Sequence, residues 1–286
     1  MRKILALFRL LRVKQWIKNL LVFVAPIGAG VEPTWSTLKI SCLGFIGFSL
    51  MASAVYIIND YRDRKMDRNH PKKKNRPIAS GEISEKLALA VLIILLICSF
   101  VLIEDFGPEA ILTVLCYLLI NIAYSFKLKT FPVLELGIVA SGYSLRILFG
   151  AQMFSLVASS WLMVSTFSAA FGVVAAKRLA ELEDSKRSSA EKRQVLSEYS
   201  SLALQSTSTL AFGTAFTTYS LWLFEHAVDL QILPLACEML ALVLAAFLLI
   251  ETSRGRLETP EDLVHSRRFV SIFSVFVFLN LVLLYI

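Results

Sequence analysis

The chain has 286 residues, of which 56% are hydrophobic, and its mean hydropathy is +0.67. This composition excludes an ordinary soluble domain, because long apolar stretches of this kind are typical of transmembrane helices. We interpret the net charge of +7 as a result of membrane topology and of attraction to anionic lipids and phosphates, and we expect no nucleic-acid partner.

Apolar stretches recur along the whole chain and predict nine transmembrane helices. The predicted spans are residues 16–31, 40–58, 87–103, 110–124, 133–154, 157–176, 204–224, 232–250 and 269–286. The expected fold class is therefore all-α. We expect a polytopic membrane protein whose residues 1–286 form a single integral membrane domain.

The distribution of basic residues predicts the orientation of these helices. Of the 29 Lys and Arg residues, only Lys39 and Arg146 lie outside one set of alternating segments. Basic loops stay on the cytoplasmic side during insertion. We therefore expect a multi-pass protein of the inner (plasma) membrane, with the N-terminus inside, the C-terminus outside and the charged loops 59–86 and 177–203 in the cytoplasm.

The first of these loops begins with three aspartates at helical spacing. Asp60, Asp63 and Asp67 stand at positions i, i+3 and i+7, so a continuation of the preceding helix would place them on one side. Mg²⁺ prefers carboxylate oxygens together with water and phosphate oxygens. Asn59 precedes Asp63 by four residues and is expected to orient it or to join the shell. The alternative is a solvated acidic helix end paired with neighbouring basic residues.

A basic cluster follows the aspartates. His70 and Pro71 end the predicted helix, and Lys73 and Arg76 come shortly after. Arg76 precedes a Pro77 to Gly81 turn, and a guanidinium on a rigid turn suits a phosphate group. The alternative for the neighbouring lysines is a positive-inside anchor.

Further candidate residues lie in and beside the predicted spans. Arg146 is about mid-helix, where an ionisable group usually faces a partner or a cavity; it is either a phosphate clamp or half of an ion pair with Glu135. Lys14, Lys18 and Asn19 enter the first span, where they contact a phosphate headgroup or act as an interfacial anchor with Trp16.

The motifs in these segments resemble a known family. Asn59-Asp60-x-x-Asp63-x-x-x-Asp67, with Arg76-Pro77-x-x-Ser80-Gly81, resembles the first aspartate-rich motif of the UbiA-type membrane prenyltransferase superfamily. His70-Pro71-x-Lys73, the stretch 11–19 and Lys177-Arg178-x-x-Glu181-Leu182 are similar to its decaprenyl-phosphate phosphoribosyltransferase branch. The second motif departs from the two-aspartate form of aromatic prenyltransferases, since it offers Glu181 and Asp184.

The resemblance implies a UbiA-like helical bundle with a Mg²⁺-diphosphate site at the cytoplasmic face. It also implies transfer of a 5-phosphoribosyl group from phosphoribosyl pyrophosphate to a polyprenyl phosphate, with release of pyrophosphate. Asp60, Asp63 and Asp67 are then the catalytic metal ligands. The expected substrate-binding residues are Asn59, Lys14, Lys18, Asn19, His70, Lys73, Arg76, Arg146, Lys177, Arg178 and Glu181.

Two other functions stay open at this point. One is a UbiA-type enzyme that moves a prenyl chain from a diphosphate to an aromatic acceptor. The other, from a different class, is a non-catalytic polyprenyl-lipid binder or transporter. A transporter is expected to have broken helices that meet at the bilayer midplane, and the chain has only modest Gly or Pro interruptions in its spans. Oligomerisation is also left open.

Overall fold

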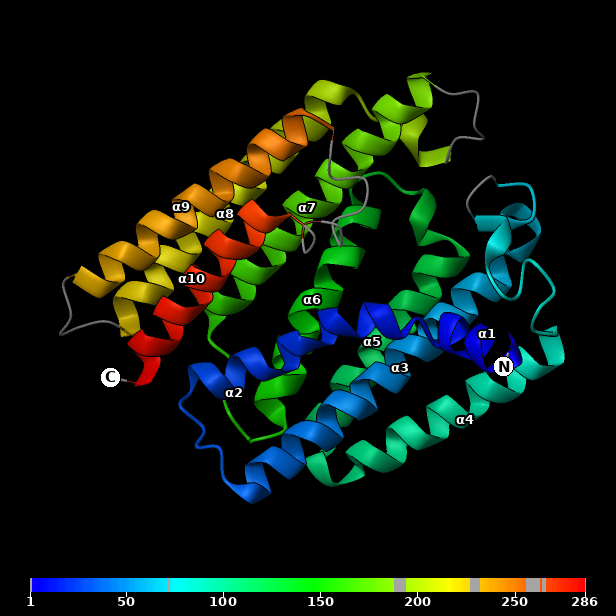
Figure 1. The fold of residues 1–286 in the computed structure, drawn as a ribbon, viewed down its shortest axis with the longest axis horizontal. Helices are drawn as coiled ribbons and strands as arrows, with labels where there is room; N and C mark the ends of the chain where they lie inside the picture. The colour runs from blue at the N-terminus through cyan, green and yellow to red at the C-terminus, as the bar shows by residue number, and fades with distance from the viewer. Residues whose placement is uncertain are drawn as a thin grey trace. The chain divides into compact units, whose positions relative to one another are not determined.

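A computed structural model describes residues 2–70, 73–187, 194–226, 232–255, 263 and 266–285. Every regular element in these ranges is a helix (Figure 1). The α-helices are α1 (Arg2–Leu11), α2 (Val24–Gly28), α3 (Trp35–Asp67), α4 (Glu85–Ile103), α5 (Pro108–Phe126), α6 (Leu134–Gln152), α7 (Ser160–Arg187), α8 (Ser201–His226), α9 (Ile232–Ser253) and α10 (Arg267–Tyr285). The 3₁₀ segments are η1 (Val13–Phe23), η2 (Lys73–Asn75), η3 (Glu104–Phe106), η4 (Leu128–Thr130) and η5 (Gln194–Glu198).

The chain forms two compact units. The first comprises Met1–Pro26, Val31–Ile138 and Leu145–Val157. The second comprises Ile27–Gly30, Val139–Ser144 and Ala158–Ile286. The first unit therefore carries α1, α3, α4 and α5, and the second carries α7 to α10. That the two act as one membrane domain stays a prediction.

Seven helices in the described ranges are long and apolar enough to cross a membrane, namely α3, α4, α5, α6, α7, α9 and α10. The expectation of an all-α, multi-pass membrane protein is confirmed. The expected span at 204–224 is the 26-residue α8, which is not among the seven; nine of its residues are Ser or Thr. The count of nine spans and the orientation stay predictions.

The expected first span, residues 16–31, does not form one regular α-helix. Its beginning is η1, an 11-residue 3₁₀ segment, although such runs rarely exceed a few residues. Side chains fasten η1 to α3: the Trp16 Nε1–H donates to Ser53 Oγ at 3.0 Å, and the Asn19 amide donates to Ser49 Oγ at 2.9 Å. These tertiary bonds stabilise a backbone that the apolar pattern alone does not predict.

The long helix α3 positions the candidate site. It begins at a Thr34 N-cap, whose hydroxyl accepts a hydrogen bond from the Thr37 N–H at 3.3 Å. Its middle packs closely, because a Cβ on Gly47 would stand 2.6 Å from Ile103 Cγ2 of α4. Small residues at helix contacts allow such approach in membrane proteins. The cap and this packing fix the helix that ends at Asp67.

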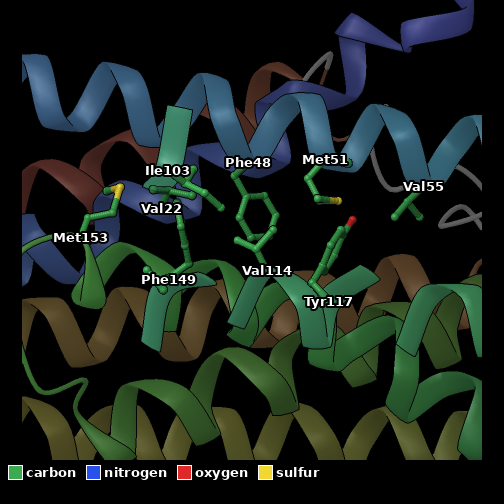
Figure 2. Close-up of a cluster of buried hydrophobic side chains, with 11 residues drawn as sticks. Val22, Phe48, Met51, Val55, Ile103, Val114, Tyr117, Phe149 and Met153 are labelled. Carbon is green, nitrogen blue, oxygen red and sulfur yellow. The ribbon is translucent and has the colours of Figure 1, made fainter. Parts of the chain in front are cut away.

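The core of the first unit lies between α3, α5 and α6 (Figure 2). Phe48 of α3 is fully buried, with ring centroids 4.9 Å from Tyr117 and 5.3 Å from Phe149. Next to Phe149 in the chain, a Cβ on Gly150 would lie 1.9 Å from the Val22 carbonyl oxygen, so the backbones of α6 and η1 touch. The contacts of Phe48 hold the middle of α3 against α5 and α6, on the N-terminal side of the aspartates.

Candidate functional site

The C-terminal end of α3 carries Asp60, Asp63 and Asp67, called here the aspartate cluster. Asp60 and Asp67 are only 2% and 4% exposed, while Asp63 is partly buried. Acidic side chains are unfavourable at a helix C-terminus, and buried carboxylates are costly without partners. Cationic partners are therefore required for this arrangement to persist.

Arg76 is the partner that two members of the cluster share. Its Nη1 atom lies 2.7 Å from Asp67 Oδ2 and 3.1 Å from Asp60 Oδ1. The turn that holds Arg76 is closed by two backbone bonds, from the Ser80 N–H to the Arg76 carbonyl at 2.8 Å and from the Ile83 N–H to the Pro77 carbonyl at 3.0 Å. Since one atom contacts both carboxylates, Asp60 and Asp67 are near neighbours in space.

Hydrophobic anchors fix this turn to the first unit. Ile78 and Ile83 are each 2% exposed and pack in one cluster with Ile57 of α3 and with Ala6 and Leu10 of α1. Gly81 adopts φ +79°, a left-handed conformation that glycine adopts without steric cost. The guanidinium of Arg76 is thus carried by a turn whose flanks are buried.

Arg12 and Lys129 complete the site, although neither was among the predicted binding residues. Arg12 Nη2 lies 2.5 Å from Asp60 Oδ1, and its guanidinium lies 4.8 Å from the centre of the Tyr56 ring. Lys129 Nζ lies 2.5 Å from Asp63 Oδ1. For Lys129 the available signal was a short basic loop on the side of the membrane predicted for the aspartates. For Arg12 it was membership of the motif in residues 11–19.

Charges within the site balance. The three carboxylates of the aspartate cluster face three cations, Arg12, Arg76 and Lys129. Asn59 does not bond to Asp63 as one prediction had it; its side-chain oxygen accepts a hydrogen bond from the Ser125 hydroxyl of α5 at 3.3 Å. Asn59 therefore ties the end of α3 to α5.

The residues present fit Mg²⁺ if two carboxylates hold the ion and water and substrate phosphates complete its shell. Within the described ranges, no group of three or more His, Cys, Asp or Glu side chains is arranged to hold a metal ion. The pair Asp60 and Asp67 nevertheless offers adjacent carboxylates, the ligands with which Mg²⁺ is typically held while water and substrate phosphates complete its shell. Arg76 occupies one oxygen of each of these two carboxylates.

Two predicted binding residues lie instead in a buried polar network of the first unit. Arg146 is 5% exposed; its Nε–H donates to the Asn19 side-chain oxygen at 2.8 Å, and its Nη2 donates to the Tyr117 hydroxyl at 3.2 Å. Its guanidinium also lies 5.3 Å from the centre of the Phe48 ring. These contacts connect η1, α5 and α6, and the phosphate-clamp role of Arg146 stays a prediction.

The remaining predicted residues of the first unit lie on η1 and just after α3. Lys14 is exposed and Lys18 is partly buried on η1. The Lys73 N–H donates to His70 Nδ1 at 3.3 Å, so His70 shapes the turn that leads to Arg76. Pro71, part of the motif, lies outside the described residues.

Lys177, Arg178 and Glu181 lie on α7 of the second unit. Arg178 is 3% exposed, and its Nη1 lies 2.9 Å from Glu181 Oε2. Asp184 is exposed one turn further along. A buried arginine paired on its own helix indicates a polar centre in the second unit, and the role of these residues in substrate binding stays a prediction.

Comparison with known proteins identifies related chains. The sequence profile of the UbiA prenyltransferase family matches residues 20–280. Decaprenyl-phosphate phosphoribosyltransferase of Mycobacterium tuberculosis is 38% identical over 221 residues, which cover 76% of this chain and 73% of that protein. The enzyme of the same name from Corynebacterium glutamicum is 33% identical over 231 residues, covering 78% and 69%.

The fold also has a solved counterpart. The structure of a UbiA homolog from Archaeoglobus fulgidus bound to GPP and Mg²⁺ superposes with a TM-score of 0.75, covering 98% of this chain and 100% of that chain at 20% identity. At this identity the likeness establishes the fold alone.

Proposed function

Because this chain belongs to the UbiA prenyltransferase family, we propose that it transfers a 5-phosphoribosyl group from phosphoribosyl pyrophosphate to a polyprenyl phosphate and releases pyrophosphate. The relatives from Mycobacterium tuberculosis and Corynebacterium glutamicum supply the donor and acceptor classes. The structural observation that supports the proposal is Arg76 shared between Asp60 and Asp67. This arrangement brings together two carboxylates that can bind a metal ion and a guanidinium that can bind a phosphate group.

The reaction breaks the bond from C1 of the ribose to the pyrophosphate oxygen and forms a bond from C1 to an oxygen of the lipid phosphate. The leaving group gains negative charge as the bond breaks, and cations at fixed positions stabilise that charge. Arg76, Arg12 and Lys129 are the cations that the structure gathers there. A phosphate monoester has a second pKa of about 6, so the acceptor is ionised near neutral pH and no strong general base is required.

A metal ion fits this scheme. Asp60 and Asp67, with Asp63 nearby, would hold Mg²⁺, which supplies neutralisation of the pyrophosphate when bound. Before substrate arrives, the cluster is neutralised by its own basic side chains. We infer an exchange in which Arg76 turns from the two carboxylates to the phosphates of the donor, while Arg12 stays beside Asp60.

Attack by the lipid phosphate is expected in line with the departing pyrophosphate. Single displacement at a sugar carbon inverts the anomeric configuration. The donor is α-configured, so the product lipid is expected to be β-configured. Product NMR that showed retention would contradict a single displacement.

The proposed function also depends on the side of the membrane on which the site lies. We propose nine membrane spans, the N-terminus inside and the C-terminus outside, with the aspartate cluster at the cytoplasmic face of the inner membrane. There a soluble phosphorylated sugar and a membrane lipid both reach it. The asymmetry of the 29 Lys and Arg residues supports this orientation. Lys177, Arg178 and Glu181 of the second unit are proposed to bind substrate.

The test is to identify the product formed by the purified protein. Incubation with phosphoribosyl pyrophosphate, Mg²⁺ and a polyprenyl phosphate should yield a polyprenyl-phosphoryl phosphoribose detectable by mass spectrometry. A parallel incubation contains a prenyl diphosphate and an aromatic acid, since a solved UbiA homolog was bound to GPP. A prenylated aromatic product, without the phosphoribosyl lipid, would favour the second function and overturn the first.

A further inference from the structure

A cavity of about 1020 Å³ extends from the aspartate cluster along the N-terminal helix. It belongs entirely to the first unit, and lies between α1, the beginning of η1, the end of α3 and the turn that carries Arg76. Asp60 and Arg76 are among its lining residues. The cavity is therefore continuous with the proposed reaction site.

One face of α1 lines this cavity, and its chemistry changes along its length. Leu5, Phe8 and Arg9 contribute from α1, and their spacing of i, i+3 and i+4 places them on one helical side. Leu5 and Phe8 are each 57% exposed. Arg12, which follows the end of α1, also lines the cavity, so the lining passes from apolar side chains to two guanidinium groups.

Another face of α1 is packed against the first unit. Leu10 is 0% exposed and belongs to the cluster that contains Ile57 and Ile78. Arg9 also forms an ion pair with Glu82, at the end of the turn that carries Arg76. This helix is therefore fixed on two sides, and its exposed apolar residues lie at a defined position beside the cavity.

Arg12 makes the junction between the two parts of the cavity. Its backbone is left-handed, with φ +49° and ψ +45°, a conformation that is strained for a residue with a Cβ. The ion pair with Asp60 and the Gln15 N–H bond to the Arg12 carbonyl at 2.7 Å hold it there. Strain of this kind persists where the surroundings fix it, and often at ligand sites.

We propose that this cavity binds the polyprenyl phosphate acceptor, with its phosphate beside Arg12 and Lys14 and its first isoprene units against Leu5 and Phe8. The inference rests on the proposed function and deepens it. The change in the cavity lining from apolar to cationic side chains matches a lipid that has an apolar chain and a single anionic head group. The sugar-phosphate donor is polar throughout, so it has no complement to two exposed apolar side chains. Lys14 also lines the cavity, and its side chain forms no ion pair or hydrogen bond within the described part of the chain, which leaves a cation available for the head group.

A matched control separates this site from simple attachment of α1 to the membrane. Ile4 is 58% exposed on the same helix but does not line the cavity. If α1 only rests on the bilayer, Ile4→Ser should weaken function as much as Leu5→Ser or Phe8→Ser. If the cavity holds the acceptor, only the latter two should do so.

The measurement is the KM for polyprenyl phosphate at saturating phosphoribosyl pyrophosphate, in detergent micelles. Burial of a large apolar side chain against ligand is worth enough for roughly a tenfold change, so Leu5→Ser and Phe8→Ser should each raise this KM about tenfold. The KM for the donor, the kcat and the melting temperature should stay near wild type. Ile4→Ser should match wild type in all four quantities.

Two outcomes would overturn the inference: equal increases for Ile4→Ser, or no increase for Leu5→Ser and Phe8→Ser while the wild type forms product. Failure of the proposed function gives a different result, namely no phosphoribosyl lipid from the wild type. In that case direct binding of a fluorescent polyprenyl phosphate to the same four proteins measures the affinity of the cavity for the lipid without turnover. Unchanged affinity in the Leu5 and Phe8 variants would then sink the inference.

Discussion

Removal of the shared cation, by Arg76→Gln, should destabilise the protein as well as inactivate it. Arg76 is the one cation within 4.0 Å of Asp67 among the described residues, and the side chain of Asp67 is 5% exposed. Breaking a buried ion pair from one side typically costs 3–5 kcal/mol. Since the side chain of Arg76 is 25% exposed and Arg12 still neutralises Asp60, we expect a loss of about 2–3 kcal/mol in the free energy of unfolding.

The assay combines unfolding of the purified protein, by denaturing detergent or by heat, with transfer activity. Activity of Arg76→Gln should fall by roughly 10²–10³-fold, as when one preorganised donor to a developing negative charge is removed. The double variant Asp67→Asn with Arg76→Gln is the control, because it removes both charges. It should recover stability to within about 1 kcal/mol of wild type and no activity. If Arg76→Gln unfolds like wild type, or the double variant regains activity, the reasoning is refuted.

Three further predictions follow from other contacts. Lys129→Ala should lower the free energy of unfolding by about 1 kcal/mol, which is less than the loss for Arg76→Gln, because Lys129 and Asp63 both have partly exposed side chains. A loss equal to that of Arg76→Gln, or larger, would contradict this ranking. Gly150→Ala should lower the unfolding free energy by more than about 2 kcal/mol, since its Cβ would meet the Val22 carbonyl; a wild-type melting curve would show that the two backbones are further apart. Chelation of divalent ions should abolish transfer and leave the melting temperature unchanged, because the carboxylates already have cationic partners; a large drop in melting temperature would indicate a structural metal.

Local sequence spacing was sufficient to predict the aspartate cluster. Helical periodicity over seven residues places Asp60, Asp63 and Asp67 near one another, and the Pro77 to Gly81 pattern indicated a turn at Arg76. Arg76 follows Asp67 by nine positions. Features that depend on a helix and on the turn directly after it can thus be predicted from a single sequence.

The partners that close the site come from distant parts of the chain. Arg12 lies 48 residues from Asp60, and Lys129 lies 66 residues from Asp63. No spacing rule connects such pairs, because they are set by how α3 packs with η1 and α5. Arg146 and Asn19, 127 residues apart, were both expected to bind substrate, and only packing of the first unit reveals that they bond to each other.

Backbone geometry near the N-terminus was unpredictable for a related reason. The apolar pattern of residues 16–31 is that of a membrane helix, yet the bonds of Trp16 and Asn19 to serines of α3 accompany a 3₁₀ segment. Hydropathy reports how apolar a segment is and carries no information on which side chains will bond to it. The same limit applies to α8, whose many hydroxyls reduce its hydropathy although it is long.

The central claim, pentosyl transfer from C1 of the donor, is tested most directly with a doubly labelled donor. Phosphoribosyl pyrophosphate carrying ¹⁴C in the ribose and ³²P in the β-phosphate is incubated with the purified protein, Mg²⁺ and polyprenyl phosphate. The account predicts ¹⁴C in the extracted lipid and an equal amount of ³²P in free pyrophosphate. Both labels in the lipid, or neither label leaving the donor, would contradict it.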